Sequence, residues 1–542
     1  MRWIAEWAAL PEGLSGRELA DALVGAGLEV ESVERVGADV TGPVVIGRVV
    51  GLVDEPQKNG KTIRWCHVDV GPEHAPESAP GPLRADQPVE RLASGAWPRG
   101  VVCGALNFVA GDHVIVALPG ASLPGGFAIG SRKTYGHVSD GMICAEDELG
   151  LGADHTGIMV LGDTDDGRAW QVGEPALEAL GVTDEVLDMP ITSDMGHCLS
   201  VRGLAREAAQ ALGVRFTDPV ATPTPGASQD GYPVRLESEA CALFVALTVT
   251  GVDPTRPTPR WMASRLAAVG MRSISLAVDI SNYVMLETGQ PNHCYDADAL
   301  QGPIVVRGAR PGERLVTLDD VDRALDPGDL VIADARGPIG LAGVMGGEAT
   351  ELRDTTTGIV IEAAHFDPVT VARMGRRHRL GSEASRRFER WVDPGAAYPA
   401  AHRVAELLVQ LGGGSLEEAE TIAGGVPAMT GQTIAADLPQ RVLGMAVPED
   451  RVVAVLEASG VSVTRSGADL QLVPPTWRRD LIDPYDYVEE VGIKVGLENL
   501  PSVVPPAPVG RGLTRAQSVR RALGKALAVA GFVEVLTFPW AS

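Results

Sequence analysis

A glutamate inside an apolar run is the first residue whose type and place suggest chemistry. Glu362 stands in IVIEAAHF (359–366), a run with the composition of a buried strand. Burying a carboxylate is costly unless a hydrogen-bond donor meets it. Glu362 is therefore a candidate for binding a ligand that carries a donor.

Further candidates stand on either side of that run. His293 follows Gly-Gln-Pro in GQPNHCYDADAL, and Ser382 and Ala384 lie in RLGSEASRRF. A lone histidine at such a place is more often a hydrogen-bonded structural residue than a catalyst. As a catalytic group it would orient a water molecule, and a serine hydroxyl and a small alanine are compatible with a reacting centre nearby.

A cationic cluster occupies residues 373–390, with seven arginines against two glutamates. One interpretation is a solvated helix face. The other is a phosphate-binding rim, because guanidinium groups pair well with phosphates. The candidates for that rim are Arg376, Arg377, Arg386 and Arg387.

Acidic residues gather near the C-terminal end of the sequence. Asp486, Glu489 and Glu490 are spaced i, i+3 and i+4, on one face of a helix that Asp483-Pro484 would begin, and Asp480 lies just upstream. Acidic residues in a first turn favour the helix dipole without any ligand. The same oxygen donors would also suit Mg²⁺.

Short β-rich runs separated by Gly, Pro and polar turns fill residues 41–151 and predict a small barrel. Such barrels bind single-stranded or looped nucleic acid through strand faces and cationic loops. Lys58, Lys61, Arg132 and Lys133 are the candidate cations, with ordinary solvated loop residues as the alternative.

The bulk composition limits the class of protein. At 542 residues several domains are expected, and the formal charge of −25 argues against non-specific wrapping of nucleic acid, so DNA is not an expected partner. The six cysteines form no CxxC pair and no long apolar run occurs, which predicts a cytoplasmic protein without membrane spans.

Helices are predicted after Ser15, over 199–212 and 399–411, from Pro448 to Gly460, from Pro484 to Val495 and around 516–530, with a strand after the last one. Linkers are predicted at Asp218–Gly226 and Pro501–Gly510.

The motifs together resemble the β subunit of bacterial phenylalanyl-tRNA synthetase. The strings that carry the resemblance are CGALNFVAGDHVIVALPGASLPGGFAI, SDGMICAEDELGL, SDMGHCLSVRGLARE, DISNYVMLETGQPNHCYDADAL, GVMGGE, IVIEAAHF, RRHRLGSEASRRFERWVDP and PPTWRRDLIDPYDYVEEVGIKVG. The sequence departs from that family at Met195, where arginine is usual, at Ser382, where some members have threonine, and at Trp391, where glycine is usual.

The resemblance implies an α+β multidomain fold. It places an N-terminal α/β module at 1–40, continued at 152–217, an inserted OB-fold tRNA-binding domain at 41–151, a mixed α/β editing domain at 218–412, a winged-helix-like B5 domain at 428–504 and, at 511–542, the beginning of a class II synthetase-like catalytic core, cut short at the C-terminus.

The resemblance also implies a function. Such β subunits join α subunits in an α2β2 phenylalanine–tRNA ligase, in which α binds ATP and phenylalanine, and β contributes assembly, tRNA(Phe) binding and hydrolysis of mischarged Tyr-tRNA(Phe). His293, Glu362, Ser382 and Ala384 match the family's editing residues, and Asp480, Asp486, Glu489 and Glu490 match its Mg²⁺-binding positions. Two rival functions are a non-catalytic tRNA-binding or assembly module and a stand-alone trans-editing hydrolase.

Overall fold

The computed structural model describes residues 1–37, 39–58, 60–151, 157–162, 169–219, 222–504, 506, 510 and 512–540. The chain divides into two compact units, Met1–Leu497 and Glu498–Ser542. Parts of the predicted linkers at Asp218–Gly226 and Pro501–Gly510, and of the connection after Leu151, lie outside the described residues. None of the helices in the described ranges is long and apolar enough to cross a membrane.

The N-terminal segment folds against residues that lie far along the sequence. Strand β1 (Ser32–Arg35) pairs antiparallel with β12 (Glu185–Asp188), and helix α2 (Gly16–Gly25) packs on α4 (Val201–Leu212). Helix α2 begins with a capping box in which Ser15 and Glu18 satisfy each other's backbone N–H groups. Short helix α1 (Arg2–Ala5) also packs on α4, whereas α3 (Ala176–Ala179) packs on the β-rich region described next.

The β-rich region forms an antiparallel sheet in the order β10-β5-β2-β3-β4, with β11 paired to β5. Its strands are β2 (Val44–Pro56), β3 (Thr62–Asp69), β4 (Arg99–Cys103), β5 (His113–Ala117), β10 (Met142–Ile143) and β11 (Val160–Leu161). Two small hairpins join β6 (Ser122–Leu123) with β7 (Phe127–Ala128) and β8 (Ser131–Thr134) with β9 (His137–Asp140). Valine and isoleucine side chains alternate into cores on both faces of the sheet.

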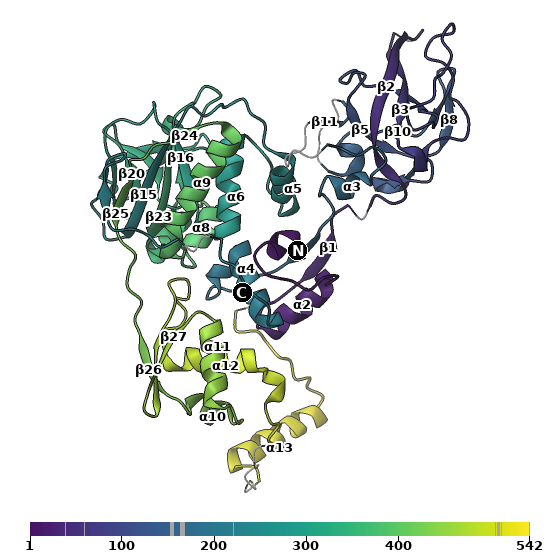
Figure 1. The fold of residues 1–542 in the computed structure, drawn as a ribbon. Coiled ribbons are helices and arrows are strands. Elements are labelled where there is room, and N and C mark those ends of the chain that lie inside the picture. The colour runs from purple at the N-terminus through teal and green to yellow at the C-terminus, as the bar shows by residue number, and fades with distance from the viewer. Residues whose placement is uncertain are drawn as a thin grey trace. The chain divides into compact units, whose positions relative to one another are not determined.

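The central region is built on a sheet in the order β13-β25-β15-β23-β16, with β24 paired to β15. Its strands are β13 (Ser228–Gln229), β25 (Thr421–Gly424), β15 (Cys241–Thr250), β23 (Ile359–Phe366), β16 (Asn292–Asp296) and β24 (Ser415–Leu416). Helices α6 (Leu276–Thr288) and α9 (Ala397–Gly412) cover one face, as Figure 1 shows, and α5 (Arg260–Ala268) packs on α6.

The other face of this sheet meets a second sheet in the order β14-β17-β20-β21-β22. These strands are β14 (Val234–Leu236), β17 (Ile304–Gly308), β20 (Leu330–Ala333), β21 (Pro338–Leu341) and β22 (Met345–Gly346), accompanied by the hairpin β18 (Arg314–Val316) and β19 (Asp322–Ala324). Because both of its faces are covered, every residue of β23 is buried. That burial explains why its sequence reads as a continuous apolar run instead of an alternating one.

Residues 432–495 form a smaller layer of helices on a sheet. Strands β26 (Gln432–Ala435), β28 (Asp469–Val473) and β27 (Ser462–Ser466) pair in that order. Helices α10 (Leu438–Leu443), α11 (Glu449–Ala458) and α12 (Pro484–Val495) share its hydrophobic core. Asp483 caps α12 with Pro484 at its first turn, as the sequence predicts.

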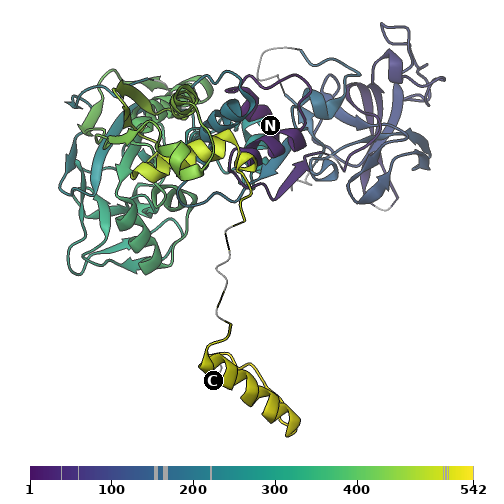
Figure 2. The same cartoon turned by 90° about the horizontal axis from the view of Figure 1, so that it is seen from below.

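The second unit contains α13 (Arg515–Val529), which follows a capping box at Thr514 (Figure 2). The strand predicted after it is wrong, because residues 532–538 have no regular secondary structure. A strand needs a hydrogen-bonding neighbour, and the described residues of this unit supply none.

Candidate functional site

Glu362 and His293 are brought together by strand pairing. They are directly opposite each other in the antiparallel pair of β23 and β16. Side chains that are opposite in such a pair point to the same face, and this face is the one that meets the second sheet. Two residues that are 69 positions apart in the sequence are thus neighbours on adjacent strands.

Tyr295 is a third member of this group, and sequence reasoning missed it. Its hydroxyl donates a hydrogen bond to Oε2 of Glu362, and its ring lies edge-on to the His293 ring, with centroids 4.5 Å apart and planes at 77°. Alternation along a strand carried the signal, because residues i and i+2 of β16 share a face.

These side chains line a cavity of about 90 Å³ between the two sheets. Its remaining wall is mostly apolar or small, and consists of Pro291, Asn292, Ile332, Gly340, Leu341, Ala342, Gly343, Val344, Met345, Gly346, Ala384 and Phe388. A mostly apolar wall with one carboxylate and one imidazole is the composition expected of a specific small-ligand site.

Gly346 is required by this geometry. A Cβ atom at that position would come within 2.5 Å of Cε1 and 2.8 Å of Nε2 of His293. Any side chain there would displace the imidazole. The motif GVMGGE therefore leaves room for the His293 ring, and the sequence alone did not reveal this role.

Burial controls the charge of both ionisable groups. Burial raises the pKa of Glu362 to about 7, against a smaller lowering by the hydrogen bond from Tyr295. Burial also lowers the pKa of His293 to about 4, so the imidazole is neutral at pH 7. Its Nε2 is shielded from solvent and has no hydrogen-bond partner among the described residues.

Ser382 and Ala384 belong to the start of α8 (Glu383–Phe388), which follows α7 (Pro368–His378). Ala384 lines the cavity. The Ser382 hydroxyl accepts from the Ser385 backbone N–H at 3.0 Å and donates to the Val344 carbonyl at 2.8 Å. It caps α8 and holds that helix against the cavity wall, so it is placed beside the cavity rather than among its lining residues.

A separate groove of about 660 Å³ runs along α7 and α8. Arg376 and Arg386 are exposed and line it, together with Arg379 and Arg390. Ser382 also borders this groove. The polar rim and the apolar cavity therefore share one short helix.

The other two predicted rim arginines have internal partners. Arg377 pairs with the buried Asp329, and Arg387 is itself buried, donating to the Leu199 carbonyl at 3.0 Å and to Glu383 at 2.7 Å. A buried guanidinium offers no surface to a phosphate. The structure thus corrects the prediction for Arg387, which ties α8 to the segment before α4.

The four acidic residues predicted to hold Mg²⁺ do not converge. Arg478 donates to Asp480 at 2.7 Å and to Glu490 at 2.6 Å, while Asp486 accepts from the backbone N–H groups of residues 482 and 483, and Glu489 is exposed. A guanidinium already neutralises two of the four carboxylates, and it lowers the pKa of Glu490 despite the opposing effect of burial. As arranged in this chain, the residues do not fit a closely coordinated Mg²⁺ ion.

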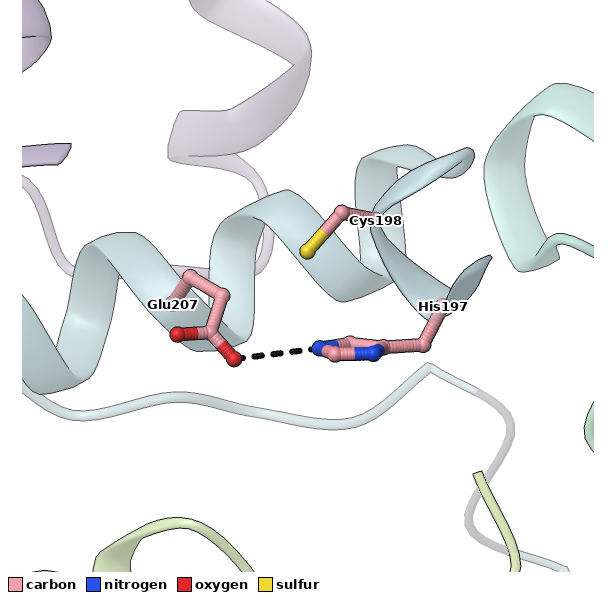
Figure 3. Close-up of side chains that lie close together, drawn as sticks. All are labelled: His197, Cys198 and Glu207. Carbon is pink, nitrogen blue, oxygen red and sulfur yellow. Dashed lines mark hydrogen bonds and ion pairs between the residues drawn. The ribbon is translucent and has the colours of Figure 1, made fainter. Parts of the chain in front are cut away.

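His197, Cys198 and Glu207 are the three potential metal ligands that do approach one another, within 4.8 Å, among the described residues (Figure 3). Nε2 of His197 lies 3.1 Å from Glu207, whose other oxygen is 2.5 Å from Nζ of Lys494. The ammonium and imidazole hold the pKa of Glu207 far below its usual range, despite its burial. We interpret the group as a buried charge network that joins α4 to α12.

The four predicted loop cations come from neighbouring hairpins. Lys58 and Lys61 flank the turn between β2 and β3, and Arg132 and Lys133 lie on β8. His137 on β9 is 3.0 Å from Glu55 at the end of β2, which holds the two hairpins side by side. All four cations are exposed, and the Arg132 guanidinium lies 5.7 Å from the centre of the exposed Phe127 ring.

Trp391 has a φ of +74°, in the left-handed region. Glycine enters that region without steric cost, whereas a bulky residue does not. The indole has compensating contacts: Nε1 donates to the Thr476 carbonyl at 2.8 Å, and the ring packs against His365 and Arg479. The departure from the usual glycine thus joins the central region to residues 476–479.

Comparisons with known proteins agree with this architecture. Residues 240–413 match the model of the B3/4 domain, and residues 432–497 match that of the tRNA synthetase B5 domain. Curated proteins named phenylalanine–tRNA ligase beta subunit are similar along the chain: that of Cutibacterium acnes is 53% identical over 100% of this chain and 63% of its own length. That of Thermobifida fusca is 50% identical over 99% of this chain and 62% of its own length. That of Streptomyces avermitilis is 49% identical over 100% of this chain and 62% of its own length.

The domain matches define a chain that carries a tRNA synthetase B5 domain behind a B3/4 domain. Over its whole length the chain is homologous to phenylalanine–tRNA ligase β subunits, which confirms the resemblance seen in the motifs. It spans about three fifths of the length of these curated relatives.

The raised pKa of Glu362 predicts a pH-dependent cost in stability. Between the ordinary value of 4.5 and about 7, the unfolded chain ionises this carboxyl while the folded chain keeps it protonated. Folding therefore loses up to about 3 kcal/mol as pH rises through that window, and the loss is constant above it. Glu362→Gln cannot ionise, so it should unfold at a higher temperature than the unaltered chain at pH 8 but not at pH 4. Equal differences at both pH values would contradict the burial of an ionisable carboxyl.

The contacts of Arg478 predict that magnesium does not change the thermal stability of the chain. Millimolar Mg²⁺ or EDTA should leave the melting temperature of the isolated chain unchanged, because Asp480 and Glu490 already have a cationic partner. Arg478→Gln should make the melting temperature rise on adding Mg²⁺, since two carboxylates lose their counter-charge. A rise of several degrees with the unaltered chain would contradict this prediction, because it would show that Mg²⁺ binds the folded chain despite the Arg478 contacts.

Proposed function

We propose that this chain works as the tRNA-binding and proofreading subunit of a phenylalanine–tRNA ligase, and that its central cavity hydrolyses tyrosine attached to tRNA(Phe). The observation that carries the proposal is the Glu362 carboxylate, buried opposite His293 in an otherwise apolar cavity. The homology to phenylalanine–tRNA ligase β subunits supports it.

The chemistry of phenylalanine selection explains why a carboxylate is useful here. An apolar pocket that accepts phenylalanine rejects an added hydroxyl only weakly, by about a hundredfold in comparable cases. A second site must then recognise that hydroxyl. A buried carboxylate does so strongly, because a phenol satisfies it, whereas phenylalanine would leave it without its partner.

Hydrolysis needs water at the ester and space for the terminal ribose. Water adds to the ester carbonyl, and the bond to the ribose oxygen breaks, which releases tyrosine and restores the tRNA hydroxyl. His293, neutral at pH 7 and with an unpartnered Nε2, would orient the water or the ribose. Ala384 leaves room beside the cavity, and Ser382 fixes the helix that carries it.

The size of the cavity implies movement when a substrate enters. Its volume of about 90 Å³ is smaller than the ~150 Å³ apolar cavity that accommodates benzene. A tyrosine ring would therefore displace part of the wall. Met345 is the side chain best suited to move, because methionine is flexible and only partly buried here.

The arginine groove would hold the acceptor end of tRNA. Arg376 and Arg386 are exposed in it and can pair with phosphates. Arg377 is already paired with Asp329, and Arg387 is buried. The phosphate contacts would then lie on α7 and α8, next to the residues that line the cavity.

The complete enzyme is a further part of the proposal. An α subunit would bind ATP and phenylalanine, and two copies of each chain would form an α2β2 tetramer in the cytoplasm that makes Phe-tRNA(Phe). We assign residues 41–151 to an OB fold, 218–412 to the editing domain, 428–504 to a winged-helix-like B5 domain and 511–542 to the beginning of a catalytic-core-like domain. Mg²⁺ binding at Asp480, Asp486, Glu489 and Glu490 would require the α subunit, because Arg478 occupies two of these carboxylates in the chain alone.

A non-catalytic tRNA-binding role is the second candidate, and the β8–β9 hairpin favours it. Arg132 and Lys133 are exposed there, next to the exposed rings of Phe127 and Tyr135. Tyr135 holds a φ of +50° at a Tyr-Gly turn where asparagine or glycine is usual. Cations interleaved with exposed aromatic rings suit unpaired nucleotides.

The test is release of tyrosine from Tyr-tRNA(Phe), with and without an α subunit. Both Glu362→Ala and His293→Ala should lower the rate by at least ~100-fold, the range of a positioned catalytic group. Glu418→Ala is the matched control, since it removes an exposed glutamate of the same region and should leave the rate unchanged.

Equal hydrolysis by the unaltered chain and both cavity variants would reject the assigned site. Binding of tRNA without any ester hydrolysis, even with α present, would favour the non-catalytic role. Hydrolysis by a chain that stays monomeric and needs no α subunit would favour a stand-alone editing hydrolase.

A further inference from the structure

We propose that Tyr295 is a positioning residue of the cavity: its hydroxyl holds one oxygen of Glu362 in the carboxylate form and leaves the other oxygen to accept the phenol of the substrate. The inference rests on the proposed proofreading function and adds a residue and a pH dependence to it.

The contacts of Tyr295 are the first argument. Its side chain is 1% exposed, so a hydroxyl without a partner would be costly. The hydroxyl donates to Oε2 of Glu362. Among the described residues no hydrogen bond reaches Oε1, and Glu362 is part of the cavity wall. The carboxylate therefore has one oxygen tied to the protein and one available to a ligand.

The absence of any nearby charge is the second argument. Among the described residues, His293 and Tyr295 on β16 share a face with Glu362, and two thiols interact with it electrostatically: Cys241 on β15, and Cys294 on β16, which points to the opposite face. The imidazole is neutral above about pH 4, and burial raises the pKa of both thiols, so all four groups are uncharged at pH 7. Among the described residues, the Tyr295 hydroxyl is thus the one donor that favours the ionised carboxylate over the neutral acid.

The ionised form matters for recognition. A carboxylate accepts a hydrogen bond from a phenol more strongly than a neutral carboxyl does. Tyr295 also packs edge-on against His293, so the same ring fixes the second functional side chain. The Tyr295 hydroxyl thereby favours the ionised form of Glu362, which can then accept a hydrogen bond from the phenol of the substrate.

An opposite role is conceivable for the same contact. If the Tyr295 hydroxyl occupied the place of the substrate's phenol, it would act as an internal competitor. Removing it would then increase activity. The two roles predict changes of opposite sign, so one variant separates them.

The experiment measures kcat/KM for hydrolysis of Tyr-tRNA(Phe) between pH 5.5 and 9.5, for the unaltered chain, Tyr295→Phe and Glu362→Gln, with an α subunit if activity requires it. The unaltered chain should rise to a plateau with a midpoint near 7, as Glu362 ionises. In Tyr295→Phe the midpoint should move up by about one pH unit, with about a fivefold loss at pH 7 that is recovered above pH 9. Tyr283→Phe removes a buried hydroxyl that contacts Arg265 instead, and should leave the midpoint unchanged.

An unchanged midpoint in Tyr295→Phe, or a higher activity at pH 7, would overturn the proposal. If Glu362→Gln behaved like the unaltered chain, the proofreading site itself would be wrong. Melting temperatures measured from pH 5 to 9 give a test that needs no hydrolysis. The pH-dependent loss of stability begins where the unfolded chain ionises Glu362 and ends where the folded chain does, so it should continue to a higher pH in Tyr295→Phe and be missing in Glu362→Gln. Coincident curves for the unaltered chain and Tyr295→Phe would overturn the role of the hydroxyl.

Discussion

The covering of strand β23 on both faces is the constraint on which the site depends. Helices α6 and α9 bury one face, and the second sheet covers the other, so Glu362 is only 7% exposed. A carboxylate in that environment needs a partner, and within the described part of the chain the neutral hydroxyl of Tyr295 is the one that it has. Under the proposed function, the Glu362 oxygen that has no hydrogen bond to the protein would make the cavity select a ligand with a donor. Burying this incompletely hydrogen-bonded carboxyl group lowers the stability of the fold, and the surrounding core is large enough to compensate for that loss.

Charged residues elsewhere in the first unit differ from Glu362 because they have partners of opposite charge. Glu207 and Lys494, Arg478 and Glu490, and Arg202 and Asp393 are pairs of buried side chains that satisfy one another, and Arg202 also pairs with the partly buried Asp218. Removing one partner of such a pair costs about 3–5 kcal/mol, because it leaves an unpaired buried charge. These pairs join α4 to α12 and to the segment after α8. The residue types of Glu490 and Arg387 suggested metal and phosphate binding, but these residues have internal partners in Arg478 and Glu383.

Several elements could be predicted from the sequence because local chemistry determines them. The capping residues Ser15 and Asp483 mark true helix starts, and the apolar run around Glu362 is a doubly buried strand. The partners of individual charges could not be predicted, since Arg387 meets Leu199 and Arg478 meets Glu490 only through tertiary packing. Tyr295 and Gly346 were missed for the same reason: the first acts through a cross-strand neighbour, and the second through the space that it leaves for His293.

Calorimetric titration of the chain with adenosine carrying tyrosine or phenylalanine in a non-hydrolysable 3′-amide linkage would test the central claim most directly. The account predicts that the tyrosyl compound binds at least tenfold more tightly than the phenylalanyl one, and that Glu362→Ala removes this difference while leaving the phenylalanyl affinity within about threefold, since a buried hydrogen bond to a charged group is worth roughly 1.5–3 kcal/mol. Equal affinities for the two compounds, or a preference that persists in Glu362→Ala, would contradict it.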